Sequence, residues 1–135
     1  MHIATQPQST AAAAGAAQFR HLWLELTRKC NLQCVHCYAN SGPDLPISDG
    51  MTTHDWLVLL RSSRAEGCSS VQFIGGEPLI YPDLPLLLQE ASSLNFEEIE
   101  VFTIRHTYHA GVGSAILEAQ CKDRLVVLLA YKGAP

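Results

Sequence analysis

The sequence predicts an α/β fold in which about three parallel β-strands alternate with two α-helices, and three observations lead to it. Short apolar or alternating runs, typical of strands, recur at residues 22–26, 71–74 and 99–103. Two segments with helical apolar spacing separate them, and strands joined by helices of this size form right-handed parallel βαβ units. Hydrophobic residues make up 47% of the 135-residue chain, enough for one packed core, so we expect one domain or part of one.

The first 18 residues precede this pattern. Their Ala-rich stretch at 11–17 resembles the hydrophobic region of a signal peptide, but no Lys or Arg precedes it and alanine is only weakly apolar. We therefore expect a disordered leader at 1–18 and a cytoplasmic protein. The longest apolar run, 125–131, is far shorter than the roughly 20 residues that span a bilayer. The net charge of −4 gives no reason to expect nucleic acid or an anionic membrane as a partner.

The first strand is followed by a loop at 27–51, and loops of this length are usually functional. Thr52 or Thr53 then caps a helix, with Asp55 completing a capping box from Thr52, and Gly67 ends it. The apolar face of this helix is expected to hold Trp56, Leu59, Leu60 and Ala65.

The second strand, at 71–74, is mostly apolar, as buried parallel strands are. Asp83 can cap the second helix, with Pro85 tolerated in its first turn. The buried face of this helix is expected to hold Leu84, Leu87, Leu88, Ala91 and Leu94. The third strand follows at 99–103.

The five cysteines are distributed unevenly: Cys30, Cys34 and Cys37 fall close together, whereas Cys68 and Cys121 stand alone. An odd number cannot pair fully within one chain, so the cluster indicates metal ligation rather than disulfides. Its C-x3-C-x2-C spacing supplies three thiolates for one polynuclear iron–sulfur cluster. A cubane cluster has four irons, so one iron would stay open to an exogenous ligand.

A zinc site completed by His36 or His54 is the alternative interpretation of the same cysteines. Zinc sites usually take four protein ligands, often in two closely spaced pairs, and the sequence has no second pair of cysteines. The iron–sulfur interpretation is therefore favoured.

A second motif, Gly75, Gly76, Glu77 and Pro78, directly follows the second predicted strand. It therefore lies at the same edge of the sheet as the cysteines, where α/β proteins place their active sites. Two glycines let the backbone approach a ligand closely because no Cβ intervenes. Pro78 stiffens the turn, and Glu77 supplies a carboxylate that can hold a ligand ammonium group.

Together these motifs resemble the radical S-adenosylmethionine (radical SAM) superfamily. The stretch Leu24-Glu-Leu-Thr-Arg-Lys-Cys30 through Cys37-Tyr-Ala-Asn40 looks like the start of its SPASM-type, peptide-modifying maturase branch. The resemblance covers residues 22–103 and implies the N-terminal half of a partial (β/α) radical SAM barrel.

The resemblance also implies the cofactors and their sites. Cys30, Cys34 and Cys37 would hold a 4Fe–4S cluster whose open iron is chelated by the amino and carboxylate groups of SAM. The motif at 75–78 would bind the methionine end of SAM, with Glu77 facing its ammonium group. In the family, the position of His36 is often aromatic and contacts the adenine, and Tyr38 could share that packing.

The activity implied is that of an enzyme that cleaves SAM reductively into a 5′-deoxyadenosyl radical, which abstracts hydrogen from a peptide or protein. No catalytic residue is assigned beyond the cluster ligands, and a flavodoxin- or ferredoxin-like electron donor is expected. The alternatives are a non-catalytic iron–sulfur module and an inactive truncated pseudo-enzyme. Within the family, a small-molecule substrate is the second possibility.

Residues 104–135 form an atypical tail. Members of this branch typically place Asn after the threonine that matches Thr103, whereas Ile104 stands here. We consider a frameshift and, alternatively, a genuine short variant in which residues 125–131 form a fourth strand. Three strands are about half of the family's barrel, and a half-barrel exposes apolar faces and strand edges. We therefore expect poor stability and little turnover from the isolated chain unless a partner or self-association completes the barrel.

Overall fold

The computed structural model describes residues 19–48, 50–103 and 125–129, and in this part of the chain it contains one four-stranded sheet of order β1-β2-β3-β4. Every neighbouring pair of strands is parallel. The elements are β1 (His21–Glu25), α1 (Thr53–Ala65), β2 (Ser70–Ile74), the 3-10 helix η1 (Pro78–Ile80), α2 (Leu84–Ser93), β3 (Glu98–Thr103) and β4 (Leu125–Leu129). The predicted order of three strands and two helices is confirmed.

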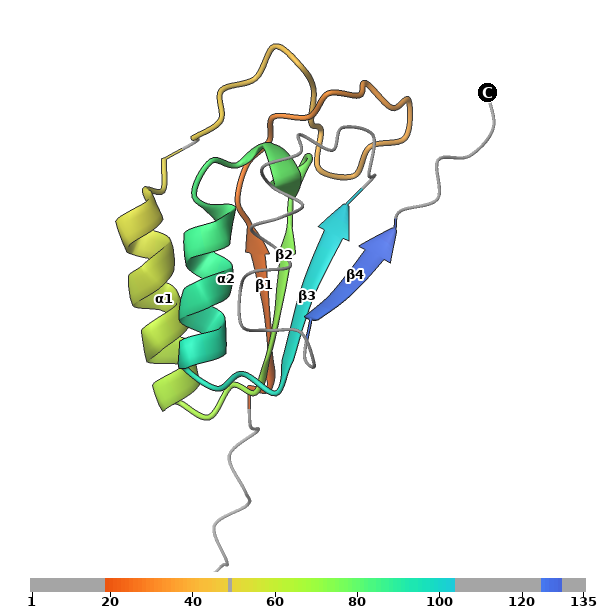
Figure 1. Ribbon diagram of the computed structural model, residues 1–135. Coiled ribbons are helices and arrows are strands. Elements are labelled where there is room, and N and C mark those ends of the chain that lie inside the picture. The colour runs from red at the N-terminus through yellow and green to blue at the C-terminus, as the bar shows by residue number, and fades with distance from the viewer. Residues whose placement is uncertain (1–18, 49, 104–124, 130–135) are drawn as a thin grey trace, which may run out of the picture.

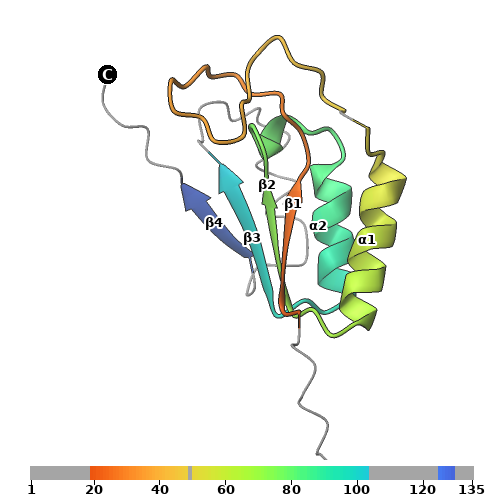
Figure 2. The same cartoon turned by 180° about the vertical axis from the view of Figure 1, so that it is seen from behind.

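Both helices lie on the same face of the sheet (Figures 1 and 2). The loop that follows β1 lies above the carboxyl ends of the strands, next to η1 (Figure 1). Right-handed βαβ connections produce this arrangement, because successive crossovers in the same direction return along the same face.

The core lies between the helices and the sheet, and the strand register aligns its residues. Leu22 of β1 pairs with Val71 of β2, which pairs with Ile99 of β3. The next inward-facing row is Leu24, Phe73 and Val101. All six side chains are buried. Because side chains alternate between the two faces of a strand, residues two positions apart share a face, and both rows lie against the helices.

Helix α1 begins as the sequence predicts. Thr52 is its N-cap, its hydroxyl accepts from the Asp55 N–H, and the Asp55 carboxylate accepts from the Thr52 N–H at 2.8 Å. Gly67 follows the end of the helix with φ of +92°, a conformation that glycine adopts without strain. The predicted apolar face needs one correction: Trp56 and Leu60 are buried and Leu59 packs against the core, but Ala65 is exposed in the last turn.

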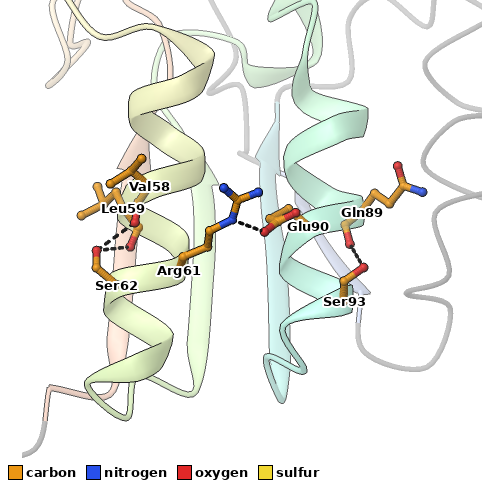
Figure 3. A network of polar contacts seen from close by, with 7 residues as sticks. All are labelled: Val58, Leu59, Arg61, Ser62, Gln89, Glu90 and Ser93. Atoms are coloured by element: carbon orange, nitrogen blue, oxygen red, sulfur yellow. Dashed lines mark hydrogen bonds and ion pairs between the residues drawn. The ribbon is translucent and has the colours of Figure 1, made fainter.

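Helix α2 buries Leu84, Leu87, Leu88 and Ala91 as predicted, and Leu94 packs against the core just beyond the helix. Asp83 is its N-cap residue, but the predicted capping hydrogen bond is absent. The Asp83 carboxylate instead accepts from the Thr53 hydroxyl at 2.6 Å and so joins the starts of the two helices. Further along, the Arg61 guanidinium of α1 donates to Glu90 of α2 at 2.7 Å (Figure 3).

The fourth strand, β4, lies in the tail. It pairs with β3 over its whole length, from Ile99 with Leu125 to Thr103 with Leu129. This agrees with the alternative in which residues 125–131 form a strand, although β4 ends at Leu129. The predicted leader at 1–18 and residues 104–124 lie outside the described residues. None of the described helices is long and apolar enough to cross a bilayer.

Candidate metal and cofactor site

The loop that carries the three cysteines, residues 30–42, is closed at its base by backbone hydrogen bonds. We call this segment the cysteine loop. The Cys30 N–H donates to the Gly42 carbonyl at 3.1 Å, and the Gly42 N–H donates to the Arg28 carbonyl at 3.2 Å. These bonds form a short parallel bridge between Lys29 and Gly42. The two ends of the cysteine loop are thereby held together directly beyond β1.

Lys29 strengthens this closure. Its ammonium group donates to the Pro43 carbonyl at 2.7 Å and to the Leu45 carbonyl at 3.2 Å. Bonds from a charged donor are stronger than those between neutral groups. Residues 43–45, which follow the cysteine loop, are therefore hydrogen-bonded to Lys29, which precedes it.

The three thiols differ in exposure. Cys30 is buried at 7% exposure, Cys37 is partly buried and Cys34 is exposed. The Leu32 N–H lies 3.4 Å from Cys30 Sγ, and the Ser41 N–H lies 3.4 Å from Cys37 Sγ. Backbone N–H groups aimed at cysteine sulfurs are a usual feature of iron–sulfur sites, where they tune the cluster.

The same contacts act on the acidity of the thiols. Burial raises the pKa of Cys30, and the negative charges of Glu77, Cys34 and Cys37 raise it further. The backbone N–H of Ser41 is the main cause of the lowered pKa of Cys37. The Ser41 hydroxyl is buried without a regular hydrogen bond in the described part of the chain, yet it lies close enough to help lower the pKa of Cys37.

The fit of these residues to a metal group depends on the kind of group. Within residues 19–48, 50–103 and 125–129, no three His, Cys, Asp or Glu side chains converge closely enough to hold a single metal ion. A zinc site would need such a convergence, because its sulfur ligands lie about 2.3 Å from one centre. A cubane cluster does not, because each thiolate binds a different iron. The three thiols, the N–H groups at two of their sulfurs and the buried Ser41 hydroxyl therefore fit a polynuclear iron–sulfur cluster.

The second motif packs directly against the base of the cysteine loop. We call residues 75–77 the glycine turn. The Gly76 N–H donates to the Thr27 carbonyl at 2.7 Å, and the Glu77 N–H donates to the Lys29 carbonyl at 3.0 Å. The two predicted motifs are therefore brought together, residue against residue, at the carboxyl edge of the sheet.

Glycine is required at both positions of this contact. Gly75 has φ of +136°, and a Cβ there would lie 2.4 Å from the Thr27 carbonyl oxygen. A Cβ on Gly76 would lie 2.2 Å from the Lys29 carbonyl oxygen. Both distances are far below van der Waals contact. In this structure the missing side chains make room for the backbone of the chain entering the cysteine loop.

Glu77 is almost fully buried, with 1% exposure. One of its carboxylate oxygens, Oε1, accepts from the Leu79 N–H at 2.9 Å and from the Thr103 hydroxyl at 2.7 Å. Pro78 is buried behind it as the first residue of η1. The carboxylate thus lies within the protein at the junction of the glycine turn, η1 and β3.

The remaining predicted residues lie at the surface. His36 is exposed, Tyr38 is 72% exposed, and His54 is exposed in the first turn of α1. The sequence motifs predict no role for Lys29 or Thr103. Their positions carried a signal, because Lys29 adjoins the first cysteine and Thr103 is a polar residue at the carboxyl end of a strand.

A family comparison covers most of the chain. The sequence model described as "Radical SAM superfamily" matches residues 24–119. The match includes the three cysteines and the glycine turn, and it extends beyond Thr103, where we expected the resemblance to end.

Three curated relatives carry the same name, "Molybdenum cofactor biosynthesis protein 1". The Mus musculus protein is 43% identical over 68 residues, which is 50% of this chain and 11% of the relative. The Homo sapiens protein is 41% identical over 68 residues, with the same coverage, and the Bos taurus protein is 42% identical over 65 residues, 47% of this chain and 10% of the relative. The chain spans about a tenth of the length of these relatives.

Among solved structures, Streptococcus suis SuiB has a similar fold. SuiB bound to the precursor peptide SuiA matches with a TM-score of 0.67 and 23% identity, over 83% of this chain and 24% of SuiB. SuiB bound to S-adenosylmethionine matches with a TM-score of 0.68 and 21% identity, over 83% of this chain and 25% of SuiB. At these identities the likeness concerns the fold.

Proposed function

The chain belongs to the radical SAM superfamily, and from that premise we propose that it forms the cofactor-binding first part of a radical SAM enzyme core. In this proposal Cys30, Cys34 and Cys37 hold a 4Fe–4S cluster, and the glycine turn with Pro78 holds the methionine end of SAM. One observation carries it. Two backbone hydrogen bonds, of 2.7 and 3.0 Å, fasten the glycine turn to the base of the cysteine loop.

Enzymes of this superfamily use a 4Fe–4S cluster and SAM. When bound, these cofactors would supply the radical chemistry, a one-electron cleavage of a carbon–sulfur bond of SAM that serves hydrogen abstraction from the substrate. The role of the protein is to bind and orient the cofactors and the substrate, and to exclude water from the site. Three thiolates leave one iron without a protein ligand, where the amino and carboxylate groups of SAM would bind.

The protein residues divide this work between them. The N–H groups of Leu32 and Ser41 point at two of the cysteine sulfurs and support their thiolate forms. Gly75 and Gly76 bring the turn against the cysteine loop, so the two cofactors would be held side by side. Glu77 supplies the negative charge nearest to the ammonium group of SAM in this proposal, and His36 and Tyr38 are the candidate contacts for the adenine.

For the substrate, we propose a peptide or protein, as in the SPASM-type branch. The likeness in fold to SuiB, which was crystallised with a precursor peptide, supports this choice. A small-molecule substrate is the second candidate, and it is supported by the 41–43% identity to relatives named for molybdenum cofactor biosynthesis. We further propose a cytoplasmic protein with a flavodoxin- or ferredoxin-like electron donor.

Anaerobic reconstitution of the chain with iron and sulfide tests the proposal. After reduction, SAM should alter the electron paramagnetic resonance spectrum of the cluster, because it would bind the open iron. Cys34→Ala should abolish the cluster. Cys68→Ala is the matched control, because it removes a buried thiol outside the motif and should leave the spectrum unchanged.

The other outcomes separate the alternatives. A chain that takes up zinc and forms no iron–sulfur cluster would overturn the proposal. A cluster whose spectrum ignores SAM would indicate a non-catalytic iron–sulfur module. A spectrum that responds to SAM without any 5′-deoxyadenosine, measured against Cys34→Ala, would indicate an inactive pseudo-enzyme.

A further inference from the structure

Thr103 and Glu77 form a buried pair that links β3 to the glycine turn. Thr103 is the last residue of β3 and is 2% exposed, and Glu77 is 1% exposed. The Thr103 hydroxyl donates to Glu77 Oε1 at 2.7 Å. The strands β2 and β3 are neighbours in the sheet, and the cysteine loop lies above the carboxyl ends of the strands (Figure 1).

Burial makes this hydrogen bond consequential. A carboxylate removed from water is costly unless donors replace the lost hydration, and bonds from hydroxyl and N–H donors to a charged oxygen are short and strong. Glu77 Oε1 receives one donor from β3 and one from η1, the Leu79 N–H at 2.9 Å. Two donors from different elements fix both the position and the rotation of the carboxylate.

The backbone of the same residue is fixed from the other side. The Glu77 N–H donates to the Lys29 carbonyl at 3.0 Å, directly before the first cysteine. Glu77 is therefore held by its main chain to the cysteine loop and by its side chain to Thr103. Removing the hydroxyl would free the carboxylate from β3, while the bond from the Leu79 N–H and the main-chain bond to Lys29 would stay in place.

We infer that Thr103 is a positioning residue for the SAM site: its hydroxyl orients the Glu77 carboxylate and so places the charge that faces the ammonium group of SAM. This inference rests on the proposed function. Thr103 acts through Glu77 and needs no contact with SAM or with the cluster.

Two substitutions isolate the hydroxyl. Thr103→Val keeps the branched shape and removes the donor, whereas Thr103→Ser keeps the donor and removes a methyl group. The reconstituted chain is titrated with SAM and with 5′-methylthioadenosine, which has the adenosine and sulfur but no amino-acid part. We expect Thr103→Val to bind SAM about tenfold more weakly, because SAM would then have to order a carboxylate that the hydroxyl no longer holds. Thr103→Ser should stay within about twofold of the unaltered chain.

The nucleoside comparison excludes a general structural effect. Affinity for 5′-methylthioadenosine should be the same in all three proteins, because it has no ammonium group. An equal loss of both ligands in Thr103→Val, or no loss of SAM affinity, would overturn the inference. If Thr103→Val does not fold, Thr103→Ala provides a smaller variant without the hydroxyl.

Amide hydrogen exchange on the cluster-free chain gives a readout that does not depend on SAM. Exchange across residues 75–80 should be faster in Thr103→Val than in Thr103→Ser, with α1 unchanged in both. Equal exchange in the two variants would overturn the inference. If the unaltered chain binds no SAM while this difference is present, the proposed function fails and the placement of the glycine turn by Thr103 stands.

Discussion

Replacing Gly76 with alanine tests whether the glycine turn and the base of the cysteine loop pack backbone against backbone. A Cβ at this position would lie 2.2 Å from the Lys29 carbonyl oxygen and 2.7 Å from its carbon. These are main-chain atoms, which cannot rotate away as a side chain would. Lys29 is also fastened to Pro43 and Leu45 through its ammonium group, so the obstructing segment is itself held in place. The turn and the loop would have to separate.

The size of the effect follows from the contacts that separation breaks. The hydrogen bonds from Gly76 to Thr27 and from Glu77 to Lys29 would be lost, each contributing about 1 kcal/mol. Residual overlap adds about 1 kcal/mol or more. We therefore expect Gly76→Ala to lower the free energy of unfolding by about 3 kcal/mol, measured by urea denaturation of the cluster-free chain.

Gly42→Ala is the matched control in the same loop. A Cβ on Gly42 would meet no atom within 4 Å, and its φ is not in the left-handed region. This variant should be unchanged or slightly more stable, by up to about 1 kcal/mol, because alanine restricts the unfolded chain. A free energy of unfolding of Gly76→Ala within about 1 kcal/mol of that of the unaltered chain, or equal values for the two variants, would show that the backbones do not pack as described.

Three further predictions concern the capping box, the ion pair between the helices and the cysteines. Hydrogen bonds from Thr52 lower the pKa of Asp55 below its ordinary 3.8, so the stability that the capping box contributes is present above pH 3.8 and is lost as pH falls through the pKa of the folded state. Asp55→Asn should therefore make the free energy of unfolding, measured by urea titration, depend less on pH below about pH 4. Arg61→Ala should lower the melting temperature by less than about 5 °C, because the Arg61 side chain is 54% exposed and its ion pair with Glu90 is screened by water; a drop above about 10 °C would contradict this. In the metal-free chain iodoacetamide should modify Cys37 before Cys30, because burial raises the pKa of Cys30 and a backbone N–H lowers the pKa of Cys37. Equal rates of modification by mass spectrometry would refute this.

Local sequence signals predicted the elements well because each acts over a few residues. The capping box of Thr52 and Asp55, the glycine that ends α1 and the alternation in β3 all form in the structure. One error occurred where a distant residue competes for the same group, and another where a helix turn lies beyond the core. Asp83 was expected to cap α2, but its carboxylate accepts from Thr53 of the other helix. Ala65 has helical spacing but lies in the exposed last turn.

The order of residues alone specifies the donor set of the candidate site: three closely spaced thiols after one parallel strand and a Gly-Gly-Glu-Pro turn after the next. What these groups contact depends on how the strands and loops pack together. In the folded chain the Cα atoms of Gly75 and Gly76 face the backbone of residues 27–29, where a Cβ would not fit. The side chain of Glu77 is hydrogen-bonded to Thr103, 26 residues further along the chain. The register of the strands explains this difference. Spacing specifies which residues can act within one loop, whereas the alignment of neighbouring strands determines which loops meet at the carboxyl edge of the sheet.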